Sequence, residues 1–332
     1  MLALFIMILR KMIKNRWLEL SLLIGLVLSV GLASSMPIYT NAILQRLLLK
    51  DLQNLQIETQ QYPGVFWSYA YLPEGIGEDE KPLYFAQTDE FLEREAADRF
   101  GIPVQYFVIE RATDKYPLAP ADPERVDPNR QRVADLVTIS DMADHIRLVD
   151  GRMPADQPVD GVYEALVVPD ALSALGMVLG NEFVIRHESL PGPIHVKPVG
   201  VIDRKQYDDV FWYNYLSSYS NSFLIDFDLF ENEFTRGGKL NVRSSYWYFA
   251  LDYSKMTLST IDNFIRTSGM IEDHLANRYE IYSTKVPALP TLGLRLGTSD
   301  QGSNPASSTT RQAYDLLAEG FGPGVNGPLT LV

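Results

Sequence analysis

The four histidines and a few paired carboxylates are the residues of this 332-residue chain whose types could do chemistry. None of the histidines falls in an HExxH motif or beside a recognisable acidic partner, and the chain contains no GxSxG elbow and no SxxK motif. No GxxxxGK[ST] loop is present either, which argues against ATP binding by a P-loop. We therefore expect a protein that is not an enzyme and that carries no cofactor and no metal site. The histidines are His145, His187, His195 and His274.

An aromatic segment at residues 206–219 (QYDDVFWYNYLSSY) is the other chemically distinctive feature. Packing between subdomains, or against a neighbouring subunit, is the interpretation that we favour. The alternative is a ligand or partner surface, because stacked aromatic rings can bind a carbohydrate, a peptide or a lipid. The candidate residues are Tyr207, Phe211, Trp212, Tyr213, Tyr215 and Tyr219.

The charge of the chain is distributed unevenly along its length. The formal net charge is −13, yet residues 1–50 carry six Lys or Arg and one Glu. The rest of the chain has 23 basic and 41 acidic side chains, a net charge of −18. Such a surface repels phosphate backbones, so we expect no nucleic-acid partner. The absence of cysteine excludes disulfides, thiolate catalysis and zinc–thiolate sites.

An apolar run from Leu18 to Ile38 must anchor whatever follows it. Twenty-one helical residues span roughly 32 Å, close to the thickness of one hydrocarbon core. A basic cluster between Arg10 and Arg16 precedes the run and no such cluster follows it. The positive-inside bias therefore predicts a single-pass protein of the cell membrane with a cytoplasmic N-terminus and an extracytoplasmic bulk. The alternative is a cleaved signal peptide, with Ala33 and Ser35 at the cleavage site, but the run is longer than an ordinary h-region.

Local patterns predict the elements of the outer part. Residues 64–72 and 104–111 have strand character, and residues 89–100 a helix with Thr88 as its N-cap. The proline-rich stretch 116–130 is expected to be an exposed excursion. A second helix should start after Thr257 and run towards Leu275.

The stretch between Ile146 and Ile202 places turns and short strands in a distinctive order. A GRMP turn is followed by a strand led by Glu164, a helix ending in LGM, a GNEFVI strand and a KPVGVI strand. Together with the N-terminal anchor and its Pro-Ile-Tyr exit, this order resembles the FtsX/MacB-type permeases of ABC transporters over roughly residues 1–288. The structural residues that we single out are Pro37, Gly151, Pro154, Gly180 and Gly200.

The tail after residue 292 has a different character. The strings LRLG at 294–297 and TTRQAYDLLAEGFGPGVNGPL at 309–329 resemble transporters of the MMPL/RND type. We therefore expect a fusion near residues 288–294, or a fragment in which the later membrane helices of a permease are absent.

The resemblance implies an α+β fold. One N-terminal transmembrane helix extends into a stalk helix, and a two-subdomain mixed α/β extracytoplasmic domain of MacB-core type follows. The expected segments are a cytoplasmic or interfacial N-terminus (1–16), a transmembrane helix (17–38), a stalk helix (39–60), a core domain (61–288, with a β-rich subdomain at about 132–205) and the MMPL/RND-like tail (289–332).

The resemblance also implies a function in transport. The chain would be the membrane-anchored outer portion of a permease that transmits ATPase-driven motion for export or extracytoplasmic signalling. Its partners would be a cytoplasmic ABC ATPase subunit, a second permease copy and the lipid bilayer. The alternatives are a single-pass receptor or assembly protein that binds a ligand through the aromatic segment, and a fragment of an MMPL/RND-type exporter.

Overall fold

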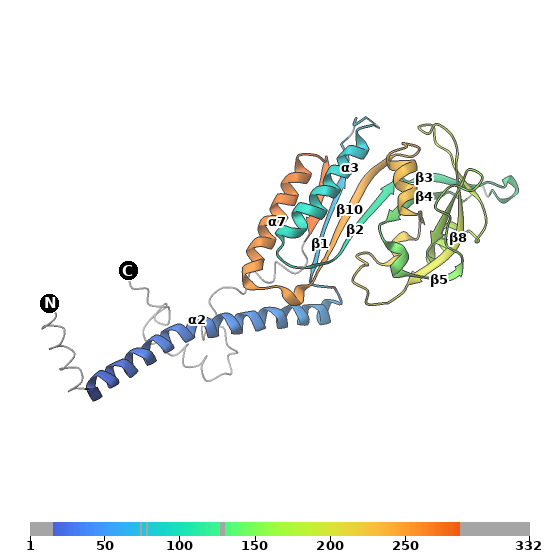
Figure 1. Cartoon of the computed structure of the whole chain (residues 1–332). Coiled ribbons are helices and arrows are strands. Elements are labelled where there is room, and N and C mark those ends of the chain that lie inside the picture. Colours follow the sequence, from blue (N-terminus) through green and yellow to red (C-terminus); the bar gives the residue numbers. More distant parts are fainter. Residues whose placement is uncertain (1–15, 74, 78, 127–129, 286–332) are drawn as a thin grey trace, which may run out of the picture.

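A long helix that projects from a globular body dominates the computed structural model (Figure 1), which describes residues 16–73, 75–77, 79–126 and 130–285. This helix, α2 (Arg16–Thr59), is continuous over 44 residues and covers both the predicted span and the predicted stalk. Among the described residues, no helix is both long enough and apolar enough to cross a membrane. The side chains of residues 32–41, which include Pro37, lie outside the described part, as does the predicted tail 289–332.

The body has a mixed α+β fold, as predicted, built on one mixed sheet of 11 strands. Its first part is antiparallel, in the order β11-β1-β10-β2. The strands are β11 (Ile281–Lys285), β1 (Val65–Tyr71), β10 (Val242–Leu251) and β2 (Val104–Thr113).

The two faces of this antiparallel part differ because side chains alternate along a strand. On β1, Phe66, Ser68 and Ala70 are buried, whereas Trp67, Tyr69 and Tyr71 lie on the opposite face and are half-buried. The helices α3 and α7 cover one face of the sheet (Figure 1). A cluster of phenylalanines fills this layer, with Phe100 placing its ring centroid 5.4 Å from Phe249 and 5.1 Å from Phe264.

The second part of the sheet closes on itself. Its order is β4-β3-β7-β8-β6-β9, and β9 returns to pair with β4 in parallel. The strands are β3 (Tyr116–Pro120), β4 (Arg132–Ile139), β6 (Val162–Val167), β7 (Phe183–Ile185), β8 (Ile194–Arg204) and β9 (Ser222–Leu224), and β5 (Ile146–Gly151) pairs with the outer end of β8. We refer to this closed part as the barrel.

Two predicted elements were wrong at their boundaries. The helix predicted at 89–100 begins eight residues earlier, because Pro82 sits in the first turn of α3 (Lys81–Glu90), where a missing N–H costs nothing. The helix then continues through a π-helical turn, η1 (Phe91–Ala96), and α4 (Ala97–Arg99). The stretch 116–130 is not wholly an excursion, because its first five residues form β3 between β4 and β7.

The remaining helices follow their local signals. α7 (Leu258–Ala276) begins at Thr257, whose side chain forms a capping box with Thr260. α5 (Pro169–Leu175) ends at Gly176 in the left-handed conformation. Short turns complete the fold: η2 (Pro123–Arg125), η3 (Met142–His145), η4 (Leu216–Tyr219), α6 (Phe227–Phe230), η5 (Glu231–Thr235) and η6 (Tyr253–Lys255).

Two of the glycines chosen from the sequence face each other across the β5–β8 ladder. Gly151 has a φ of +78°, and a Cβ there would lie 2.2 Å from the carbonyl oxygen of Val199. A Cβ on Gly200 would lie 2.4 Å from the carbonyl oxygen of Arg152. Gly180 has a φ of +81° in open space, and Pro154 lies half-buried shortly after the turn at Gly151.

Candidate functional site

The aromatic segment divides into buried and exposed residues. Phe211, Trp212 and Tyr219 are buried, whereas Tyr207 is 91% exposed and Tyr215 is 71% exposed. Tyr213 lies between these extremes, with its ring centroid 5.3 Å from that of Trp67 on β1. The sequence pattern therefore did not identify one continuous surface.

The buried residues of the segment join the outward face of the sheet to η3. The ring of Phe211 stacks on His145 with centroids 3.8 Å apart, and His145 Nδ1 lies 2.6 Å from Asp209 Oδ2. Trp212 Nε1 donates to the carbonyl oxygen of His145, and Tyr248 donates to that of Val210. These contacts fit the packing interpretation, and a role in ligand binding stays a prediction for the exposed tyrosines.

A buried carboxyl group, Glu110 on β2, lies beneath the aromatic segment. It lines a cavity of about 20 Å³ together with Tyr213 and Tyr246. Tyr219 Oη donates to Glu110 Oε2 over 2.5 Å. Burial raises the pKa of Glu110 to about 7, with a further increase from Asp135, while the hydrogen bond from Tyr219 opposes the shift.

The next residue, Arg111, forms a buried charge network on the opposite face of the sheet. Its side chain is 1% exposed and contacts two carboxylates at 2.5 Å, Asp89 on α3 and Glu231 on η5. The indole of Trp247 donates to the second oxygen of Asp89. The guanidinium lies 4.7 Å from the ring centroid of Phe85. Sequence analysis missed this network, although two adjacent charges inside an apolar strand are the signal that could have revealed it.

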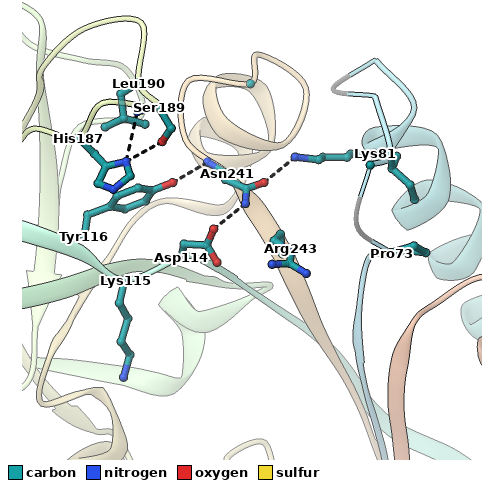
Figure 2. Close-up of a pocket in the computed structure, with 13 residues that line it drawn as sticks. Pro73, Lys81, Asp114, Lys115, Tyr116, His187, Ser189, Leu190, Asn241 and Arg243 are labelled. Atoms are coloured by element: carbon teal, nitrogen blue, oxygen red, sulfur yellow. Dashed lines mark hydrogen bonds between the residues drawn. The ribbon is translucent and has the colours of Figure 1, made fainter.

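The largest cavity, about 770 Å³, opens between the start of α3 and the barrel. Figure 2 shows Lys81, Asp114 and Tyr116 converging on Asn241. Lys81 Nζ donates to Asn241 Oδ1 and Asn241 Nδ2 donates to Asp114 Oδ2, each over 2.5 Å. The polar groups of the cavity thus bond extensively to one another, as a site that stabilises a junction would.

One pair in this cavity resembles part of a catalytic arrangement. His187 Nδ1 lies 2.8 Å from Ser189 Oγ and also accepts from the Ser189 amide. These bonds span two residues and form a local turn. In the described part of the chain no carboxylate bonds to the other ring nitrogen of His187, so the geometry lacks the third member of a triad.

The junction between α2 and the body is the remaining functional candidate. Leu48 and Leu52 are buried there, while Leu47 on the same helix is 43% exposed. Gln45 Nε2 donates to the carbonyl oxygen of Met256 over 2.6 Å, and Tyr253 donates to Gln56 Oε1 over 2.6 Å. Apolar and polar contacts together attach the helix to η6 and α7.

Comparison with known proteins gives one short match. No family model matches the chain. The chain is 51% identical over 47 residues to the membrane protein YdfJ of Bacillus subtilis. This match covers 14% of the chain and 6% of YdfJ, so it shows a partial similarity to a membrane protein and no family.

Proposed function

We propose that this chain is the membrane-anchored outer portion of a transporter permease, in which α2 carries the body away from the bilayer and couples the two. It acts as a mechanical and binding component and not as an enzyme. The observation that carries the proposal is the character of α2, whose two ends differ.

The first described half of α2 presents apolar side chains to the surroundings. Trp17 is 75% exposed, and every large hydrophobic side chain described between Leu20 and Val30 is also exposed. Burying such a surface in lipid is favourable by about 25 cal/mol per Å². The other half of the helix is fastened to the body at Leu48 and Leu52. A rigid helix that is apolar at one end and docked at the other is suited to transmit movement from a membrane to an outer domain.

The resemblance to FtsX/MacB-type permeases supplies the finer proposal. Its partners are a cytoplasmic ATPase subunit, which would drive the movement, and a second copy of the chain. The body is the MacB-core type of domain, in which the antiparallel part and the barrel are the two subdomains. We assign the match to YdfJ to the tail 289–332, which would then derive from a second kind of transporter.

The receptor alternative has less support because three of the six aromatic residues on which it rested are buried. The exporter-fragment alternative rests on the tail alone. Neither has an observation in its favour comparable to the two ends of α2.

Single-cysteine labelling tests the proposal cleanly, because the chain has no cysteine of its own. The variant Asp208→Cys places a thiol at an exposed position of the body, and Asn15→Cys places one in the predicted cytoplasmic segment. In intact cells a membrane-impermeant maleimide is expected to label Asp208→Cys only, and to label Asn15→Cys after permeabilisation. Recovery of the chain in the soluble fraction, or labelling of Asp208→Cys only after lysis, contradicts the proposal.

A further inference from the structure

A second cavity lies where the helical layer meets the barrel and differs in chemistry from the one in Figure 2. Its volume is about 430 Å³, within the range of pockets that hold small organic ligands. It is lined by η1, by the ends of β2, β4 and β9, by β6, and by the turns that begin at Asp141 and Met153.

The floor of this cavity is apolar. Ile139, Met142, Leu166 and Leu224 line it and are themselves buried in the core. Phe107 contributes an aromatic surface at the sheet. The methionines are adaptable because their side chains are unbranched and polarisable, so the floor can adjust to an apolar body.

The rim of the cavity is acidic and has no basic counterpart. Glu93, Asp141, Asp226 and Asp228 line it, and no lining residue is Lys, Arg or His. Asp226 accepts from the Leu229 amide as the N-cap of α6. No ion pair is recorded in the described part of the chain for Glu93, Asp141 or Asp228. Their negative charge is therefore directed at whatever enters the cavity.

We propose that this cavity binds a hydrophobic organic cation, with the apolar body on the floor and the positive charge at the acidic rim. Charge complementarity selects this occupant. An anion of the same shape would meet several uncompensated carboxylates, whereas a neutral ligand would gain nothing from them. The proposal stands independently of the membrane anchoring of α2, because every lining residue belongs to the body.

Two ions of matched size and opposite charge test the proposal. Tetraphenylphosphonium and tetraphenylborate share one tetrahedral shape, so a difference in their binding reports charge alone. The full chain in a neutral detergent is titrated with each ion in equilibrium dialysis, with protein-free micelles subtracted. We expect saturable binding of tetraphenylphosphonium at one site per chain and at least about tenfold weaker binding of tetraphenylborate.

Variants then locate the site. The double variant Asp141→Asn/Asp228→Asn retains the shape of the rim, since Asn tolerates the left-handed φ of +55° at position 141. We expect it to weaken tetraphenylphosphonium binding at least about fivefold. The matched control, Asp208→Asn, removes an exposed acid outside the cavity and should leave binding unchanged. A third variant, Met153→Trp, should obstruct the cavity and weaken binding.

The outcomes are decisive in both directions. Equal binding of the two ions, or tetraphenylphosphonium binding that the double variant leaves unchanged, overturns the proposal. Circular dichroism and thermal unfolding of each variant establish that loss of binding does not reflect loss of fold. Because both aspartates are exposed, their replacement by asparagine is compatible with the fold, and the charge test is available whatever the behaviour of Met153→Trp.

Discussion

Glu110 and Arg111 are neighbours on β2 whose side chains meet opposite fates, because successive residues of a strand point to opposite faces. Arg111 is buried with two carboxylates that satisfy its charge. Glu110 is enclosed without a cation and accepts from a tyrosine instead. The first arrangement stabilises an ionised group, whereas the second favours the protonated form of an acid. The two residues therefore make opposite predictions.

Replacing Glu110 by Gln should stabilise the protein above pH 7 and flatten its pH dependence. The native state has a raised pKa of about 7 against 4.5 for the free side chain, so it binds more protons than the unfolded chain between these values. Stability therefore falls as pH rises through this interval, and the loss is complete above it. We expect Glu110→Gln to gain about 1–2 kcal/mol at pH 8 and little at pH 4.

Urea unfolding of the detergent-solubilised chain at pH 4 to 8 measures this effect. The exposed Glu272→Gln is the matched control and should leave the pH dependence unchanged. A Glu110→Gln variant that is less stable than the parent chain at pH 8 would show that the carboxylate is ionised and favourably placed.

Replacing Arg111 by Met should destabilise the protein strongly. The substitution keeps an apolar stem of similar length but leaves Asp89 and Glu231 without their cation, which costs about 3–5 kcal/mol for a buried pair. The control is Arg94→Met, because Arg94 forms an exposed pair with Glu90 within one helix, worth less than about 0.5 kcal/mol. Chemical unfolding of both variants compares them directly, and equal effects would mean that the buried network contributes nothing specific.

At the scale of elements, local signals were sufficient where structure is local. Thr257 predicted the start of α7, and Gly176 the end of α5, because caps and left-handed glycines act within one turn. The start of α3 at Lys81 was missed because the first-turn Pro82 was not recognised as a helix signal. The barrel could not be predicted, since the parallel β4–β9 pair joins residues 135–137 to residues 222–224, and no local pattern encodes such a pairing.

The site residues follow the same division. The aromatic composition of the segment 206–219 was visible in the sequence, but the burial of Phe211 depends on its stacking partner His145, 66 positions earlier in the chain. The acidic rim draws on Glu93, Asp141 and Asp228, which come from three separate elements. Only the folded chain brings these charges around one apolar floor.

The contact between β5 and β8 gives a prediction at the element scale. Ala at position 200 would place its Cβ 2.4 Å from the carbonyl oxygen of Arg152, so the ladder must shift. We expect Gly200→Ala to cost about 2–4 kcal/mol in chemical unfolding. Gly180→Ala is the comparison, because its Cβ meets nothing and only its φ of +81° is unfavourable, at about 1 kcal/mol. A larger loss for Gly180→Ala would place the strain in the turn and not in the ladder.

At the scale of the whole molecule, α2 attaches to one side of the body only. Its principal contacts in the described chain are with α7 and η6, and these elements adjoin the antiparallel part of the sheet and not the barrel. Movement of the helix would therefore reach the antiparallel part first. The barrel is joined to that part through the β2–β4 ladder and through Arg111, which pairs α3 with η5.

Loss of the apolar contact at Leu52 should accordingly loosen one region and leave the other intact. Leu52 is 1% exposed, and its replacement by Ala removes about 2–5 kcal/mol of packing from the junction. Hydrogen exchange measured by mass spectrometry should show faster exchange in the second half of α2, in η6 and at the start of α7, with unchanged protection of β4 to β9. Leu47→Ala, at an exposed position of the same helix, should change neither region. Faster exchange throughout the barrel in Leu52→Ala would instead mean that the body unfolds as one unit, and that α2 cannot move one part of it against the other.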